Sequence, residues 1–115
     1  MRYFDLHCDT IGECLSRGLP LPGNGLAVGL DRAGGLAPYV QCYAVWLPDE
    51  LRGEAAFRHF CDAAGLLDRE VMASGGELLR CRTPKDLDRV EARGCRGAVL
   101  TVENGSVLGG RLEHV

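Results

Sequence analysis

The segment FDLHCDT, residues 4–10, alternates apolar side chains with side chains that can bind metal ions. The residues of metal-binding type are Asp5, His7 and Asp9. Alternate residues of an extended strand share a face, so we expect these two carboxylates and the imidazole on one side of a strand at about residues 2–8.

A third carboxylate, Glu103, stands at the end of the apolar segment GAVLTVEN, residues 97–104. The carboxyl ends of parallel strands meet at one edge of a sheet, which predicts that Glu103 lies close to His7 and Asp9. Carboxylates buried together need a cation, and imidazole with carboxylate suits Zn²⁺. Asp5 is expected to orient the imidazole. A histidine hydrogen-bonded to an aspartate at a strand end, with no metal, is the competing interpretation.

Strands must position these residues. Segments with the sequence pattern of strands alternate along the chain with segments that have the pattern of helices. Strands are predicted at about 2–8, 38–48, 77–82 and 97–104, and helices at 10–18, 49–74, 83–94 and from 106 onward. Strands separated by helices are typical of parallel pairing, so the predicted fold class is α/β.

Individual residues mark several of these boundaries. Asp49 is the predicted N-cap of the long helix, and the apolar stripe of that helix comprises Phe57, Phe60, Ala64, Leu67 and Val71. Thr83 as cap, Pro84 in the first turn and Asp86 three residues after the cap predict the start of the next helix. Gly18 and Gly94 are expected to end their helices.

Length and composition restrict the class of protein. The 115 residues suit one domain, 1–115, with 46% hydrophobic residues, 25% charged residues and a net charge of −3. No basic patch indicates a nucleic-acid partner, and no membrane span or export signal is expected. The six cysteines form no CxxC pair, which favours free thiols, mostly buried, in a reducing cytoplasm.

Three motifs together resemble the N-terminal third of the membrane dipeptidase (renal dipeptidase-like) family of zinc metallopeptidases. They are DLHCDT, LDRAGGLAPYVQCYAVWLP and LTVENGSVLGG. The residues that match the family pattern are Asp5, His7, Asp9, Gly34, Gly35, Gln41, Glu103 and Gly105. Two departures are Thr10-Ile11-Gly12, where eukaryotic relatives have Leu-Pro-Trp, and Asn104, which interrupts a run of small residues.

This resemblance implies a hydrolase that cleaves dipeptides, including those with a D-residue at the C-terminal position. The implied fold is the N-terminal portion, about three strands, of a (β/α)₈ TIM barrel of the metal-dependent hydrolase type. Two zinc ions are implied in the complete enzyme: His7 and Asp9 would bind one, and Glu103 would bridge both and act as the catalytic carboxylate.

A complete barrel takes about 250 residues, so the chain is expected to be an incomplete fragment that lacks the histidines of the second zinc site. His59 and His114 are predicted to lie on helix surfaces or in packing. Open sheet edges predict a homo-oligomer or association with the missing C-terminal part. Two alternatives are another metal-dependent amidohydrolase, although such barrels usually open with His-x-His, and a non-catalytic α/β module that pairs with another chain.

Overall fold

The computed structural model describes residues 3–115, so position 2 of the first predicted strand lies outside the described residues. The strands are β1 (Tyr3–Asp5), β2 (Tyr39–Val45), β3 (Leu78–Arg80) and β4 (Arg96–Val102). The α-helices are α1 (Thr10–Arg17), α2 (Gly53–Ala73) and α3 (Pro84–Arg93), and the 3₁₀ helices are η1 (Gly34–Leu36), η2 (Gly105–Leu108) and η3 (Leu112–His114). The α/β prediction is confirmed.

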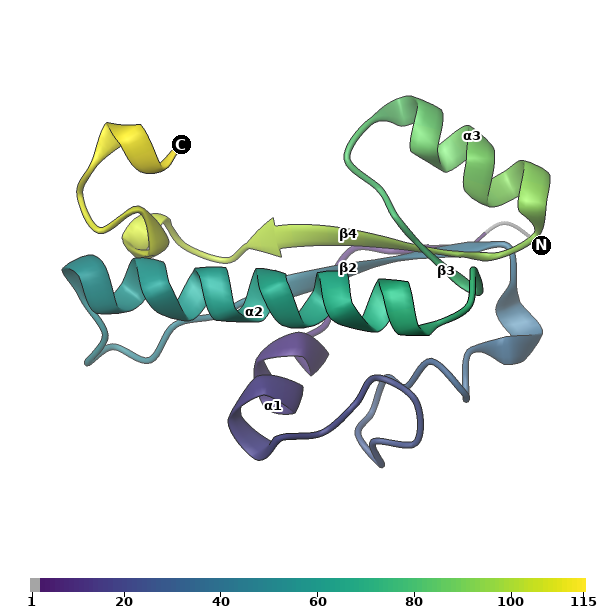
Figure 1. Cartoon of the computed structure of the whole chain (residues 1–115), viewed down its shortest axis with the longest axis horizontal. Helices are drawn as coiled ribbons and strands as arrows, with labels where there is room; N and C mark the ends of the chain where they lie inside the picture. The colour runs from purple at the N-terminus through teal and green to yellow at the C-terminus, as the bar shows by residue number, and fades with distance from the viewer. Residues whose placement is uncertain (1–2) are drawn as a thin grey trace.

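The four strands form one parallel sheet in the order β1-β2-β4-β3 (Figure 1). The long strands β2 and β4 pair along their whole length, from Tyr39 opposite Arg96 to Val45 opposite Val102. The short β3 pairs only with the beginning of β4, which leaves the later part of that edge of β4 without a partner strand among residues 3–115.

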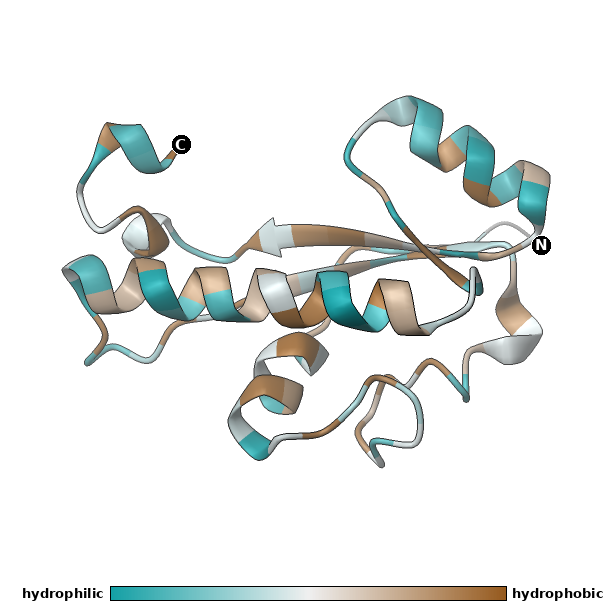
Figure 2. Ribbon diagram, viewed as in Figure 1, coloured by the Kyte–Doolittle hydropathy of each residue, from teal (hydrophilic) through white to brown (hydrophobic). Residues whose placement is uncertain are grey.

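Helices pack on both faces of the sheet. Tyr43 and Val45 of β2 join a core cluster with Ile11 of α1 and Leu67 of α2. Val40 points to the other face because its parity along the strand is opposite, and there it packs with Val90 of α3. Figure 1 shows α1 and α2 together on one side of the sheet and α3 on the other, and Figure 2 shows hydrophobic and hydrophilic residues alternating along the helices.

The predicted alternation of the first strand breaks after Asp5. Asp5 is opposite Gln41, whereas the hydrogen bonds of Cys8 with Cys42 and Ala44 place Cys8 opposite Tyr43. Three steps along the first segment therefore match two steps along β2, which is the geometry of a β-bulge. The bulge shifts the phase, so Cys8 is buried in the same core cluster as Tyr43.

The strands are shorter than predicted, and the start of the long helix and the C-terminal helix differ from the prediction. Asp49 is not the N-cap of α2, because a turn closed by the Leu51 N–H to the Pro48 carbonyl (3.0 Å) comes first and Arg52 occupies the cap position. The predicted helix from 106 onward is instead η2 and η3. Gly109 and Gly110 adopt φ values of 60° and 77°, which end the first of these helices.

The glycines predicted to end two helices are confirmed in that role. Gly18 (φ 63°) and Gly94 (φ 62°) follow α1 and α3 in the left-handed region.

All six cysteines are free, and all but Cys61 are buried. Within residues 3–115, none of the helices combines the length and the apolar character needed to cross a bilayer.

Candidate metal centre

His7, Asp9 and Glu103 converge at the carboxyl ends of β1 and β4, as predicted from strand order. The Nε2 atom of His7 lies 3.3 Å from Oδ1 of Asp9 and 3.8 Å from Oε2 of Glu103. One potential ligand atom from each residue lies within 4.8 Å of the other two. Two strands that are not adjacent in the sheet thus bring three metal-binding side chains to one place.

The backbone around Asp9 explains why its carboxylate faces the histidine. Asp9 is the N-cap residue of α1, and its carbonyl accepts the N–H of Glu13 at 3.1 Å. An N-cap aspartate usually uses its side chain to accept an amide of the first helical turn. The Asp9 side chain makes no such bond and instead lies against His7.

Glu103 is held by an extension of the parallel ladder. Its N–H donates to the carbonyl of Val45 at 3.2 Å, one residue beyond the end of β4. Asn104 is then the N-cap residue of η2, and its side chain accepts the N–H of Ser106 at 2.9 Å. The Glu103 backbone is therefore fixed on both sides of the residue.

Asp5 does not orient the imidazole, contrary to the sequence-based expectation. Its Oδ1 accepts the backbone N–H of His7 at 3.1 Å. The phase shift of the bulge is the physical reason, because it breaks the alternation that would have placed the three polar residues on one face. Asp5 thus contributes to the backbone conformation of the turn.

The predicted burial of the carboxylates is also wrong for this cluster. The side chains of His7, Asp9 and Glu103 are 52%, 61% and 39% exposed. Carboxylates in contact with water do not require a cation to offset desolvation. The case for a metal rests on the type and geometry of the donors.

These donors fit a zinc ion. With zinc–ligand bonds of about 2.0–2.2 Å, two tetrahedral ligands lie roughly 3.3–3.6 Å apart. The separation of His7 from Asp9, 3.3 Å, matches this spacing, and that of His7 from Glu103, 3.8 Å, is slightly longer. One imidazole and two carboxylates leave a coordination position open, as catalytic zinc sites do. A histidine that contacts both carboxylates with no metal is the competing interpretation, because His7 alone brings the 3.3 Å contact to Asp9 and the 3.8 Å contact to Glu103 together.

The other residues singled out in the sequence are not members of the cluster. Gln41 is buried, and its Nε2 donates to the Cys42 carbonyl at 3.1 Å. Gly34 and Gly35 lie in η1, before β2. His114 packs as predicted, with its ring stacked on Phe57 at 3.6 Å between centroids.

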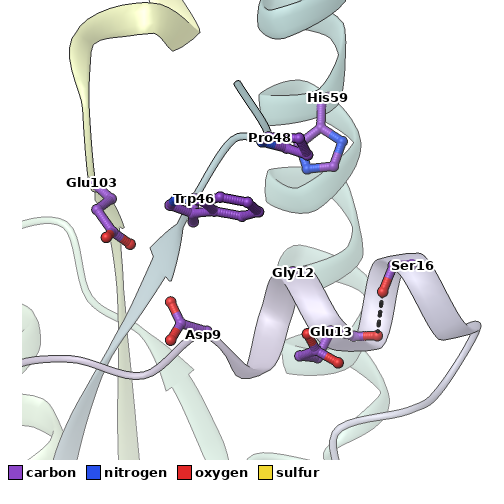
Figure 3. A pocket seen from close by; sticks show the side chains of 8 residues that line it. All are labelled: Asp9, Gly12, Glu13, Ser16, Trp46, Pro48, His59 and Glu103. Carbon is purple, nitrogen blue, oxygen red and sulfur yellow. Dashed lines mark hydrogen bonds between the residues drawn. The ribbon is translucent and has the colours of Figure 1, made fainter. Parts of the chain in front are cut away.

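A cavity of about 400 Å³ adjoins the cluster, with Asp9 and Glu103 in its wall. His59 lines it from α2, half-buried, and Trp46 lines it from the residue after β2 (Figure 3). Trp46 and Glu13 were not among the residues predicted for the site. The one available signal was a large aromatic residue beside the carboxyl end of a buried strand.

Solved structures resemble this chain, although no protein-family model and no curated protein sequence matches it. One is a metallopeptidase from Rhodobacter sphaeroides liganded with a phosphinate mimic of the dipeptide L-Ala-D-Ala. It aligns with a TM-score of 0.78 and 22% identity over 96% of this chain and 40% of that one. Another is the dipeptidase AC, a metallopeptidase of family M19, with a TM-score of 0.80 and 23% identity over 96% of this chain and 37% of that one.

The chain has the fold of these metallopeptidases. They belong to the membrane dipeptidase family that the three sequence motifs resemble. The chain spans about two-fifths of the length of each, in keeping with the predicted N-terminal portion of a larger α/β structure.

Proposed function

We propose that this chain supplies the first metal half-site of a zinc-dependent dipeptidase of the membrane dipeptidase family. The observation that carries the proposal is the cluster of His7, Asp9 and Glu103 within 4.8 Å, in a fold shared with metallopeptidases. One of those proteins is liganded with a dipeptide mimic, which supports a dipeptide as the substrate class. Dipeptides with a D-residue at the C-terminal position are included in the proposal.

The three residues would have distinct roles. His7 and Asp9 would hold one zinc ion, and Glu103 would face both that ion and a second one. Bound zinc supplies Lewis acidity, which lowers the pKa of water and polarises a peptide carbonyl. Within residues 3–115, no other group of three metal-binding side chains is as closely spaced, so the remaining ligands would come from a further polypeptide segment that completes a (β/α)₈ barrel.

Association with such a segment is part of the proposal. Apolar side chains at the sheet edges are open to solvent, with Leu6 75% and Phe4 48% exposed. Unpaired strand edges and exposed apolar residues favour association, either with the remaining barrel strands or as a homo-oligomer. The free thiols support a reducing, cytoplasmic location. A monodisperse 115-residue monomer at high concentration in sedimentation velocity would count against association.

A zinc titration by calorimetry tests the half-site directly. The chain should bind one zinc ion, and Glu103→Gln should weaken binding at least ~10-fold, since it replaces one of three donors. Asp49→Asn is the matched control, because Asp49 is an almost fully exposed carboxylate outside the cluster. In the assembled enzyme Glu103→Gln should also abolish hydrolysis of L-Ala-D-Ala. Unchanged hydrolysis would refute the proposal, and activity against cyclic amides instead would favour the amidohydrolase alternative.

A further inference from the structure

The cavity beside the metal centre extends away from it, between α1 and the beginning of α2. Gly12, Glu13 and Ser16 line it from α1, while Pro48 and His59 line it from the α2 side. In Figure 3 the ring of Trp46 lies between Glu103 and Pro48, with the α1 residues across the cavity from it. A substrate bound at the cluster could therefore extend a side chain into this space.

Gly12 has no structural reason to be a glycine. It lies within α1, its φ is not positive, and a Cβ atom added there would meet no heavy atom within 4 Å. Glycine inside a helix costs up to about 1 kcal/mol relative to alanine. Neither backbone conformation nor packing offsets this cost, but the missing side chain widens the cavity at its α1 wall.

The walls combine apolar surface with negative charge. Trp46 is 50% exposed and offers an aromatic face, and Pro48 extends the apolar surface. Among residues 3–115, the lining includes three carboxylates, from Asp9, Glu13 and Glu103, and no lysine or arginine. Asp9 and Glu103 would be neutralised by metal, so Glu13 is the carboxylate left to act on a ligand.

The negative charge of Glu13 is only partly offset by a neighbouring cation, and its side chain is accessible to a ligand. The nearest guanidinium, from Arg17, has its Nη1 atom 3.8 Å from Oε2 of Glu13, and the Glu13 side chain is 55% exposed. The Ser16 hydroxyl donates to the Glu13 carbonyl at 3.1 Å and not to the carboxylate. The Glu13 carboxylate can therefore accept a further charged hydrogen bond.

We propose that this cavity is a subsite for a basic side chain of the dipeptide substrate. The alkyl stem lies along Trp46 and Pro48, the cation pairs with Glu13, and the absence of a side chain at Gly12 provides the room. The inference rests on the proposed dipeptidase function and names its preferred substrate class as dipeptides that contain lysine or arginine. An acidic side chain in the same position would be repelled by the Glu13 carboxylate.

Trp46 makes the test direct because it is the only tryptophan of the chain. Its fluorescence is followed while Lys-Gly, norleucyl-Gly, Glu-Gly or Gly-Gly is added to the zinc-loaded protein. Lys-Gly should bind about tenfold more tightly than Gly-Gly, from cation–π and carboxylate contacts. Norleucyl-Gly, with a similar stem and no charge, should lie between them, and Glu-Gly should bind most weakly.

Two variants distinguish the effect of cavity space at Gly12 from the effect of the Glu13 charge. Gly12→Leu should remove the preference for both long side chains, whereas Gly12→Ala adds one methyl group and is the matched control for helix propensity. Glu13→Gln should abolish the difference between Lys-Gly and norleucyl-Gly. Circular dichroism of each variant checks the fold. Equal binding of all four dipeptides, or a lysine preference that survives Glu13→Gln, would overturn the subsite.

Zinc calorimetry on the same samples keeps the two proposals distinguishable. If zinc binds but the dipeptides are not discriminated, the subsite is wrong and the metal half-site stands. If zinc does not bind while Lys-Gly still outcompetes Gly-Gly in the zinc-free protein, the metal half-site is wrong and the cavity remains a site for a basic side chain.

Discussion

The imidazole Nε2 of His7 lies 3.8 Å from Oε2 of Glu103, across the end of the strand that separates β1 from β4. This relationship depends on the register of all three strands. Cys8 bonds to β2 through Cys42 and Ala44, and Glu103 bonds to β2 through Val45. The central strand therefore sets the spacing of the two halves of the cluster.

Zinc should stabilise the folded chain through this cluster. A ligand that binds only the native state at a free concentration of about 100 Kd adds about 2.7 kcal/mol to the free energy of unfolding. His7→Ala removes the imidazole, so the zinc-dependent rise in Tm should disappear in that variant. Differential scanning calorimetry with zinc and with chelator measures it, and Asp49→Asn should retain the full rise. An equal rise in His7→Ala would place the zinc elsewhere.

Close packing between α3 and the sheet makes Gly97 sensitive to substitution. A Cβ atom at Gly97 would lie 3.0 Å from Cys81 Sγ, 3.0 Å from Val40 Cγ2 and 3.1 Å from Val90 Cγ2. Gly97→Ala should therefore destabilise the protein by about 1–3 kcal/mol, as overpacking does. Urea denaturation measures the change. Gly35→Ala is the control, because a Cβ there meets nothing within 4 Å and the φ of Gly35 is not positive.

Leu67 anchors α2 in the main core and should be costly to truncate. Its side chain is fully buried among residues of α1, β2 and β4. Leu67→Ala should lower the free energy of unfolding by about 2–5 kcal/mol, because both transfer energy and a cavity contribute. Met72, on the same helix and 83% exposed, provides the control, and Met72→Ala should change stability by about 0.5 kcal/mol at most. Comparable losses in the two variants would contradict the observed orientation of α2.

Much of the fold was predictable because the decisive signals are local. The apolar run around β2, the glycine after α1 and the Thr83-Pro84 start of α3 each act within a few residues. The bulge after Asp5 was not predictable, because the polar-apolar alternation continues through it unchanged. Its position is set by hydrogen bonds to β2, which is distant in the sequence. The start of α2 was missed because Leu51 packs with Leu47 and Ala56, and a turn is needed to bring it there.

Some features of the candidate site were also predictable from the sequence, and others were not. His7, Asp9 and Glu103 could be predicted because strand ends converge in any parallel sheet. Their exposure could not, since it depends on which segments cover the edge of the sheet. The cavity lined by Trp46, Glu13 and His59 could not be predicted either. It forms between α1 and the start of α2, and no local sequence pattern determines how these two helices are placed relative to each other.

The start of α3 should carry a dependence on pH at the acidic end of the scale. Hydrogen bonds from the backbone N–H of Arg82, and from the hydroxyl and N–H of Thr83, lower the pKa of Asp86 to about 2. The ordinary value, expected in the unfolded chain, is near 3.8. The unfolded state therefore takes up a proton first as the pH falls, and the stabilisation by ionised Asp86 is complete above about pH 4 and lost between there and about pH 2.

Asp86→Asn removes this contribution and makes the prediction measurable. At pH 6 the variant should melt at a lower temperature than the unaltered chain, and the difference should shrink steadily as the pH is lowered from 4 to 2. Thermal melts followed by circular dichroism provide the comparison. Asp88→Asn, at an exposed position of the same helix, controls for the general loss of one negative charge. A Tm difference that stays constant down to pH 2 would show that Asp86 stabilises the helix by something other than its ionised hydrogen bonds.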